Sequence, residues 1–226
     1  MDIKLFAIPC GWLTMPLGNF LRDEPGTIRV PIPAYLIDHP KGKVLFDSGL
    51  RPKARAGGAE YLGRRAAYVE VEMDSEDEIM ARLERLDVDI AGVRYLVNSH
   101  LHFDHAGGNA QVPNAPVVIQ RPEWEAGHDA DRIHENGYFP SDYDLGQDVL
   151  QVDGEYDLFG DDSIVCIPTY GHTPGHQSLR VRQKGGDVVL AGDACYLRRS
   201  LEELHLPGRC HDDAQALQSF KTLRDL

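Results

Sequence analysis

The sequence is poor in cysteine, in basic residues and in long apolar runs, and each shortage excludes a class of protein. Its four cysteines, Cys10, Cys166, Cys195 and Cys210, form no C-x-x-C pair. They outline neither a disulfide framework nor a cysteine zinc site. We therefore expect buried or free thiols in a reducing compartment.

Export and membrane signals are also missing. No apolar run approaches the ~20 residues that a membrane span needs. The N-terminus carries a single lysine, an early Asp2 and no small-residue cleavage site, so no signal peptide is expected. These absences predict a cytoplasmic protein with no membrane partner.

Acidic residues outnumber basic ones by 36 to 23, which gives a net charge of −13. Such a field repels nucleic acid and anionic membrane, whereas a small neutral ligand meets no such repulsion. The 226 residues are 42% hydrophobic, enough for a sizeable core, and show no short repeat or low-complexity tract. We expect a single domain over residues 1–226.

The most informative stretch is YLVNSHLHFDHAGG, residues 95–108. Its apolar start predicts a buried strand. His100, His102, Asp104 and His105 follow within six positions, and imidazole nitrogen and carboxylate oxygen are ligands that zinc prefers. In extended backbone His100 and His102 share a face, and a turn at Asp104-His105 would direct the next two groups to a neighbouring point.

Strand and helix patterns occur twice along the chain. Pro33–Asp38 and Lys43–Asp47 flank a Pro/Gly turn and predict a hairpin. A capping box at Ser75 and Glu78 predicts a helix, and Asp212-Asp213 should cap a final one. Further strands are expected at 117–120, 149–152, 163–168, 177–182 and 187–191. Strands followed by helices, twice, indicate an α/β protein with two sheets packed face to face in a four-layer αββα sandwich.

Three segments allow two interpretations each. Residues 10–27 either cover the core as a loop or form a wall of an apolar pocket. Asp47 either caps a turn or orients a ligand histidine. The basic, Gly-rich segment 51–65 is either a mobile surface loop or a gate for substrate.

The H-x-H-x-D-H stretch after a hydrophobic strand resembles the metallo-β-lactamase superfamily of hydrolases. GHTPGHQS (171–178), LAGDACY (190–196) and PIPAYLIDHPKGKVLFDSG (31–49) resemble that superfamily's third-histidine motif, bridging-aspartate motif and early hairpin. With a tyrosine three places after the aspartate, the combination is most similar to the N-acyl-homoserine lactone lactonases. The resemblance implies the same αββα sandwich.

The resemblance also implies a ligand set for two zinc ions. Spacing alone does not choose between His172 and His176, but the family pattern selects His172 and leaves His176 a structural role. Asp193 would bridge the two metals. The first would be held by His100, His102, His172 and Asp193, and the second by Asp104, His105 and Asp193.

One departure from the family concerns the end of the chain. The family completes the second site with a histidine on a strand after the last helix, and this sequence stops at Leu226. We therefore expect a sandwich without its last C-terminal strand and a truncated sequence. His205 and His211 lack the expected context for a replacement ligand.

The resemblance implies a dinuclear zinc hydrolase that opens the lactone ring of an N-acyl homoserine lactone by attack of a metal-bridging hydroxide, a quorum-quenching activity. Tyr196 would donate a hydrogen bond to the carbonyl oxygen, and Asp104 would carry the proton to the leaving oxygen. The alternatives are another ester or thioester hydrolase (arylesterase or glyoxalase-II-like) and a non-catalytic metal-binding module. A homodimer is a further possibility for such hydrolases, although no seam is visible in the sequence.

Overall fold

The computed structural model describes residues 3–56 and 59–226. A seven-stranded sheet has the order β4-β1-β2-β3-β5-β6-β7, and a four-stranded sheet has the order β11-β10-β9-β8. The strands of the larger sheet are β1 (Lys4–Pro16), β2 (Thr27–Asp38), β3 (Lys43–Phe46), β4 (Glu70–Glu72), β5 (Val93–Val97), β6 (Val117–Gln120) and β7 (Val149–Val152). Those of the smaller sheet are β8 (Tyr156–Asp157), β9 (Ile164–Pro168), β10 (Gln177–Val181) and β11 (Val188–Leu190).

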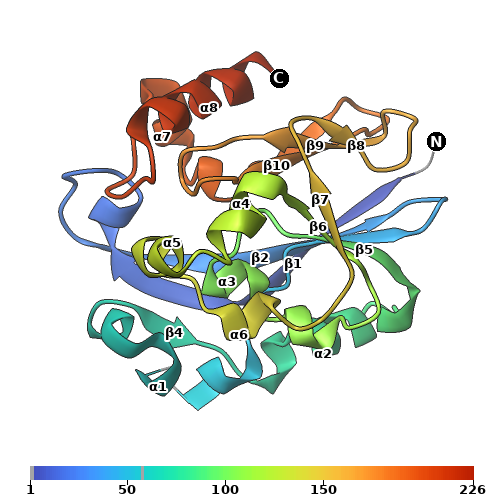
Figure 1. The fold of residues 1–226 in the computed structure, drawn as a ribbon, viewed down its shortest axis with the longest axis horizontal. Coiled ribbons are helices and arrows are strands. Elements are labelled where there is room, and N and C mark those ends of the chain that lie inside the picture. The colour runs from blue at the N-terminus through green and yellow to red at the C-terminus, as the bar shows by residue number, and fades with distance from the viewer. Residues whose placement is uncertain (1–2, 57–58) are drawn as a thin grey trace.

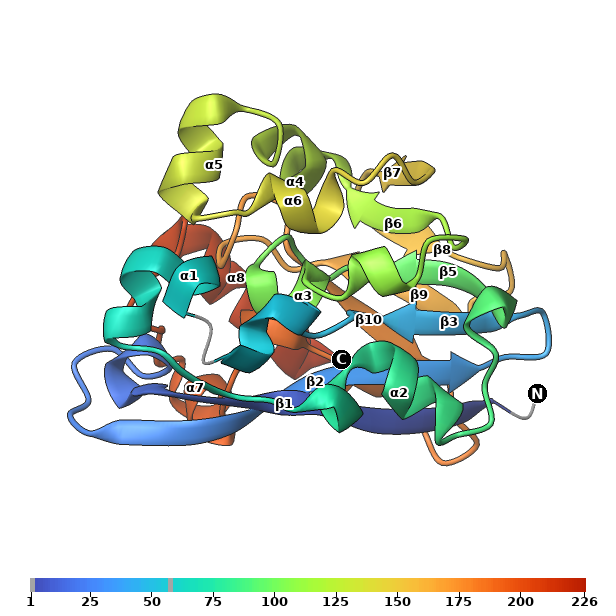
Figure 2. The ribbon, with the colours of Figure 1, turned by 90° about the horizontal axis from the view of Figure 1, so that it is seen from below.

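Most of the helices are short. They are α1 (Ala59–Leu62), α2 (Ile79–Glu84), α3 (Phe103–Ala106), α4 (Arg121–Ala126), α5 (Ala130–Asn136), α6 (Pro140–Tyr143), α7 (Arg198–Glu203) and α8 (Asp213–Asp225). Figure 1 shows α7 and α8 beside the smaller sheet, and α1, α2 and α6 on the far side of the larger one. Figure 2 shows the same order from below, with α2 in front of β1 and β2. The predicted αββα sandwich is confirmed.

Alternation along the strands builds two apolar layers. Ile37 and Val44 of the larger sheet pack with Leu179 and Val181 of the smaller sheet, between the two sheets. Their neighbours Leu36 and Leu45 point the other way and pack with Ile79 and Leu83 of α2. Because successive side chains of a strand face opposite sides, both faces of the larger sheet are buried.

The first strand extends into the segment 10–27, which shows no strand pattern in the sequence. β1 runs to Pro16 and pairs with β2 from Lys4–Asp38 to Pro16–Thr27, so a loop starting at Cys10 was wrong. The register shifts between Pro9 and Trp12, where Gly11 has a φ of +105°. A bulge at a glycine lets the strand continue although its side chains no longer alternate regularly. A search for alternating apolar and polar residues therefore does not detect this part of β1.

The helix caps were predicted with mixed success. The expected box at Ser75 and Glu78 was wrong, because Asp74 and Asp77 form the capping box of a 3₁₀ turn over Ser75–Asp77. The cap at Asp212 is confirmed, since its side chain accepts from the Gln215 backbone N–H.

Among the described residues no strand follows β11, and no helix is long and apolar enough to cross a membrane.

The basic segment 51–65 contains short helical turns rather than a plain loop, with Gly57 and Gly58 outside the described residues. It is tied to α6 through one carboxylate. Asp142 contacts the Tyr61 hydroxyl and lies 3.1 Å from Nη1 of Arg51. Asp142 is 2% exposed, and burial raises the pKa of this carboxyl to about 6.

Asp142→Asn should therefore change how stability depends on pH. The folded state holds the Asp142 proton up to about pH 6, whereas the unfolded chain releases it near 3.8. Its contribution to the free energy of unfolding is present below pH 3.8 and lost as pH rises through 6, about 3 kcal/mol in all. Urea denaturation at pH 4 and 7 should show the variant gaining on the wild type by about 2 kcal/mol, most of this amount, with the exposed Asp144→Asn as the control. Parallel pH profiles for wild type and Asp142→Asn would contradict the assignment.

Candidate metal centre

The site lies where the parallel strands of the larger sheet end. β3, β5 and β6 run in the same direction, so their carboxyl ends meet at one edge of the sheet. Asp47 follows β3, the segment with His100 and His102 follows β5, and Glu123 lies just after β6. From the other sheet, His172 follows β9 and Asp193 follows β11. This edge is where open α/β sheets bind ligands.

Four of the predicted ligands come together. His102 Nδ1 lies 2.8 Å from His100 Nε2 and 3.1 Å from His172 Nε2. Asp193 Oδ2 lies 3.4 Å from His172 Nε2. One atom from each of these four residues falls within 4.8 Å of all the others. Imidazole nitrogens converging on a carboxylate oxygen form a donor set that suits a divalent cation.

Asp104 and His105 face the other oxygen of the same carboxylate. His105 Nε2 lies 3.2 Å from Asp193 Oδ1 and 3.7 Å from Asp104 Oδ2. Both residues lie in α3, a single helical turn of four residues. Asp193 thus presents Oδ2 to the group that contains His172 and Oδ1 to His105, an arrangement compatible with the predicted bridge.

The protonation states favour metal binding at the first group. Burial lowers the pKa of His100 and of His102 well below its ordinary value, and it lowers the pKa of His172 to about 4. These rings are neutral near pH 7, and only a neutral imidazole can ligate a metal.

His105 is held differently. Burial alone would lower the pKa of His105, but the carboxylates of Asp193, Asp47 and Asp104 outweigh it and raise that pKa well above its ordinary value. A metal cation bound between these carboxylates would balance their negative charge, as the protonated His105 ring does without a metal. The chemistry of the donor set therefore fits a cation at this group as well.

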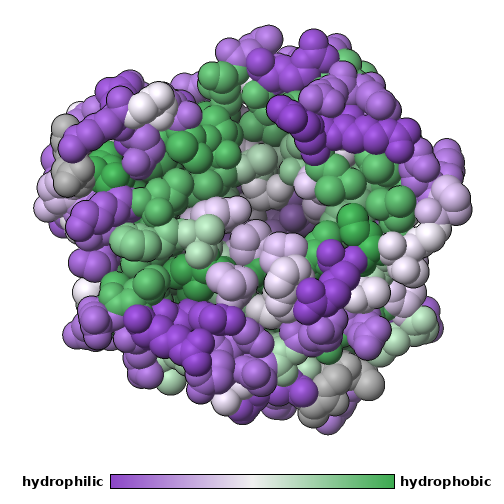
Figure 3. Space-filling view, turned by 180° about the vertical axis from the view of Figure 1, so that it is seen from behind, coloured by the Kyte–Doolittle hydropathy of each residue, from purple (hydrophilic) through white to green (hydrophobic). Residues whose placement is uncertain are grey.

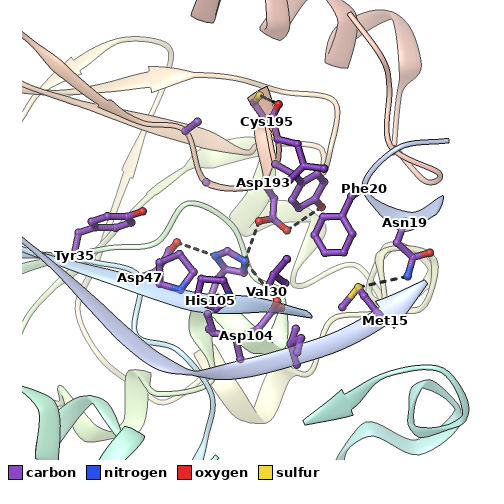
Figure 4. A pocket seen from close by; sticks show the side chains of 18 of the residues that line it. Met15, Asn19, Phe20, Val30, Tyr35, Asp47, Asp104, His105, Asp193 and Cys195 are labelled. Atoms are coloured by element: carbon purple, nitrogen blue, oxygen red, sulfur yellow. Dashed lines mark hydrogen bonds and ion pairs between the residues drawn. The ribbon is translucent and has the colours of Figure 1, made fainter. Parts of the chain in front are cut away.

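Asp47 orients His105 and does not act merely as a turn cap. Its Oδ2 lies 2.8 Å from His105 Nδ1, and its Oδ1 accepts from the Ser99 backbone N–H at 2.7 Å. Figure 4 shows the His105 ring between Asp47 and Asp193. A carboxylate on one ring nitrogen fixes the other nitrogen toward the site.

His176 takes the structural place that the family pattern gave it. Its Nε2 accepts from the Asp193 backbone N–H at 3.0 Å, and its Nδ1 lies 2.9 Å from Thr169 Oγ1. The ring is fully buried and lies outside the group of four. It holds the backbone at Asp193, so His172 and His176 have different tasks.

Tyr196 lies beside the Asp193 carboxylate. Its hydroxyl donates to Asp193 Oδ2 at 3.0 Å and lies 3.3 Å from His172 Nδ1. The ring packs edge-on against Phe20, with centroids 4.7 Å apart. Of the two histidines that follow Asp193, His205 contacts the Arg22 carbonyl through Nε2. His211 lines the same cleft as His102 and His172 but is not in the group of four.

Two clefts open at the site. A cavity of about 700 Å³ is lined by His102, His172 and Tyr196, with Met15 and Phe103 on its apolar wall. A second cavity of about 390 Å³ is mostly apolar, and Figure 4 shows part of its lining. Its wall is formed by Leu13, Met15, Asn19, Phe20, Val30, Pro31, Ile32, Pro33, Tyr35, Phe46, Leu197 and neighbouring residues.

Side chains from residues 10–27 thus line both clefts, which supports the pocket-wall interpretation of that segment. Both clefts are therefore suited to a partly apolar ligand. Figure 3 shows one face of the molecule, where apolar side chains gather around a central hollow.

Sequence reasoning missed Glu123, which is fully buried beside the site. The available signal was its position just after β6, the parallel neighbour of the strand that leads to His100. Residues after neighbouring parallel strands meet in space although they are distant in sequence.

Known proteins are similar to this chain in sequence and fold. The sequence profile of the Metallo-beta-lactamase superfamily matches residues 27–226. The chain belongs to this superfamily. As a member of this superfamily of metal-dependent hydrolases, it carries its His/Asp cluster at the expected sheet edge.

Several relatives with curated names are N-acyl homoserine lactonases. N-acyl homoserine lactonase AttM of Azorhizobium caulinodans is 32% identical over all of this chain and 89% of its own length. AttM of Agrobacterium fabrum is 31% identical over 99% of this chain and 88% of its own.

Solved structures agree with the superfamily assignment. An N-acyl homoserine lactone hydrolase with the product N-hexanoyl-L-homoserine bound at its catalytic metal centre superposes with a TM-score of 0.89. It is 30% identical, and the match covers all of this chain and 89% of the other. A variant of AiiA from B. thuringiensis with bound N-decanoyl-L-homoserine has the same TM-score at 29% identity, over all of this chain and 89% of the other.

Proposed function

We propose that this protein is a metal-dependent lactonase that hydrolyses N-acyl homoserine lactones and so quenches quorum signals. The observation that carries the proposal is the position of Asp193. Its two oxygens face separate histidine groups, and the Tyr196 hydroxyl lies 3.0 Å from one of them. The likeness to lactonases along the whole chain supports this substrate class.

The proposed metal ligands are those expected from the sequence. His100, His102, His172 and Asp193 would hold one divalent ion, and Asp104, His105 and Asp193 would hold a second, with zinc as the proposed metal. When bound, such ions bring the pKa of bound water toward ~7 and polarise a carbonyl.

Tyr196 is placed to stabilise the transition state. Burial, and then the charge of Asp193, raise the pKa of the Tyr196 hydroxyl well above its ordinary value, so it keeps its proton. It can therefore donate a hydrogen bond to a lactone oxygen as negative charge develops there.

Asp104 is placed to move the proton. Burial raises the pKa of Asp104 above that of an ordinary aspartate, so its carboxylate can accept a proton near neutral pH. Water adds to the carbonyl carbon, the bond to the ring oxygen breaks, and Asp104 delivers the proton to that oxygen. The product is an N-acyl homoserine.

The larger cleft suits an amide-linked acyl chain. Met15, Tyr68, Val69 and Phe103 offer apolar surface beside His102 and His172, and no net charge on the ligand is required. We propose that the acyl chain lies on this wall.

All four cysteines are free, in keeping with the proposed cytoplasmic location. The homodimer stays a prediction.

The test is metal stoichiometry on protein purified without chelator, with lactone hydrolysis measured on the same sample. We expect bound zinc and turnover of N-hexanoyl homoserine lactone that exceeds turnover of an aryl ester or a glutathione thioester. Preference for the thioester would assign another hydrolase activity. Absence of metal and of turnover would reject the enzyme.

Tyr196→Phe should lower kcat for the lactone by about 10²-fold with metal content unchanged, because one donor to the developing oxyanion is lost. Steady-state kinetics and metal analysis on the same preparation measure both quantities. Tyr156→Phe removes a hydroxyl from a tyrosine of β8 that lines neither cleft, and it should leave kcat unchanged. Unaltered kinetics in Tyr196→Phe would remove the residue from the mechanism.

A further inference from the structure

Glu123 is a fully buried carboxylate in the first turn of α4. It is not one of the proposed metal ligands, and the mechanism above does not use it. Its hydrogen-bond donors include two backbone N–H groups and a phenol, and the Thr173 hydroxyl also stabilises its charged form. All of these groups are neutral. Burial raises the pKa of its carboxyl. A buried carboxylate is costly unless its oxygens are well satisfied, so its contacts need a reason.

The contacts join the two ligand-bearing segments of the chain. Glu123 Oε1 accepts from the Leu101 backbone N–H at 3.0 Å, and Leu101 lies between His100 and His102. Glu123 Oε2 accepts from the Gly175 backbone N–H at 2.8 Å, in the segment that carries His172. The two donors are far apart in sequence and are brought together on one side chain.

The third contact supports His102 from another side. The Tyr138 hydroxyl donates to Glu123 Oε1 at 2.6 Å, and the Tyr138 ring packs against the His102 ring with centroids 5.6 Å apart. His102 Nε2 also lies 3.0 Å from the Asn136 carbonyl, just before Tyr138. Glu123 therefore connects the backbone and the ring environment of the same ligand.

The segment with His172 packs tightly against the backbone of α4. A Cβ added at Gly175 would lie 2.2 Å from the Glu123 backbone nitrogen. The distance between α4 and the segment with His172 is thus fixed by backbone contact as well as by the hydrogen bond.

We propose that Glu123 is a positioning residue that sets the separation between the segment with His100 and His102 and the segment with His172, and so forms the first metal site. The proposal rests on the metal site proposed above. A carboxylate can do this because it accepts on both oxygens at once. An amide of the same shape has one oxygen, and its NH₂ group would face a backbone N–H.

The experiment compares Glu123→Gln with Glu125→Gln, which alters an exposed carboxylate on the same helix. Metal-free protein competes with a chromophoric chelator for Zn²⁺, and the visible spectrum of the Co²⁺ form reports ligand geometry. We expect Glu123→Gln to lower Zn²⁺ affinity by about 10- to 100-fold, the usual loss for a group that orients ligands, and to change the Co²⁺ spectrum. Glu125→Gln should match the wild type.

Denaturation of the metal-free proteins separates positioning from mere stability. Glu123→Gln with wild-type Zn²⁺ affinity and Co²⁺ spectrum would overturn the proposal, whether or not the variant is less stable. If Glu123→Gln does not fold, Tyr138→Phe removes one donor to the same carboxylate. It should lower Zn²⁺ affinity by about 2- to 10-fold, and wild-type affinity there would overturn the proposal. A wild type that binds no Zn²⁺ would instead reject the proposed metal site itself.

Discussion

Asp193→Asn is expected to remove bound metal and lactone hydrolysis together. The carboxylate places one oxygen 3.2 Å from His105 Nε2 and the other 3.4 Å from His172 Nε2. Asparagine keeps the shape but loses the charge, and it turns an NH₂ group toward one of the two sites. Groups that only orient ligands cost 10- to 100-fold when removed. For a bridging group we expect metal affinity and kcat/KM to fall by at least ~10²-fold.

Metal analysis and lactone kinetics on one preparation test this expectation. Asp148→Asn changes an exposed aspartate and provides the control for the loss of one charge. A variant at Asp193 that keeps both its metal and its activity would contradict the bridging role. The electrostatics point the same way: burial opposes ionisation, but His105 and His172 hold the pKa of Asp193 far below its ordinary value.

Gly171→Ala is expected to give the largest loss of stability among substitutions that change only one methyl group. Gly171 has a φ of +122°, which an L side chain rarely adopts. An added Cβ would lie 2.1 Å from the backbone nitrogen of Ala216 in α8. Backbone strain and overpacking together should lower the free energy of unfolding by about 3 kcal/mol or more.

Gly186→Ala is the matched control, because Gly186 has the same φ of +122° with nothing within 4 Å of an added Cβ. Urea denaturation measures the loss in the free energy of unfolding for both variants. The loss in Gly186→Ala reports backbone strain alone, and any further loss in Gly171→Ala reports the steric clash with Ala216. Equal losses would mean that the contact with α8 is loose. His172 is the next residue after Gly171, and its carbonyl accepts from the His211 N–H at 3.1 Å. A shift of the backbone at Gly171 should therefore lower activity as well as stability in Gly171→Ala, whereas Gly186→Ala should keep its activity.

The local parts of the site could be predicted from sequence. His100, His102, Asp104 and His105 are neighbours in the chain, so their spacing limits where their side chains can point. The strands before them are apolar runs ended by polar residues, and these patterns depend on short-range geometry. The hairpin over β2 and β3 followed from the same kind of signal.

The longer-range parts could not be predicted from local pattern. Residues 10–16 of β1 show no strand pattern in the sequence, because a bulge at Gly11 breaks the alternation. The choice of His172 over His176 came from the family pattern, since both lie in one glycine-rich turn. Only the fold shows that His176 bonds to the backbone of Asp193 while His172 faces its carboxylate.

By itself, then, the sequence determined which residue types could bind a metal and which strands would be buried. The tertiary structure decided which groups hold those ligands in place. Glu123 joins Leu101 to Gly175, and Asp47 reaches His105 across 58 positions in sequence. Such contacts depend on how parallel strands and two sheets are stacked. A buried carboxylate and an exposed one look alike in the sequence until that stacking removes water from one of them.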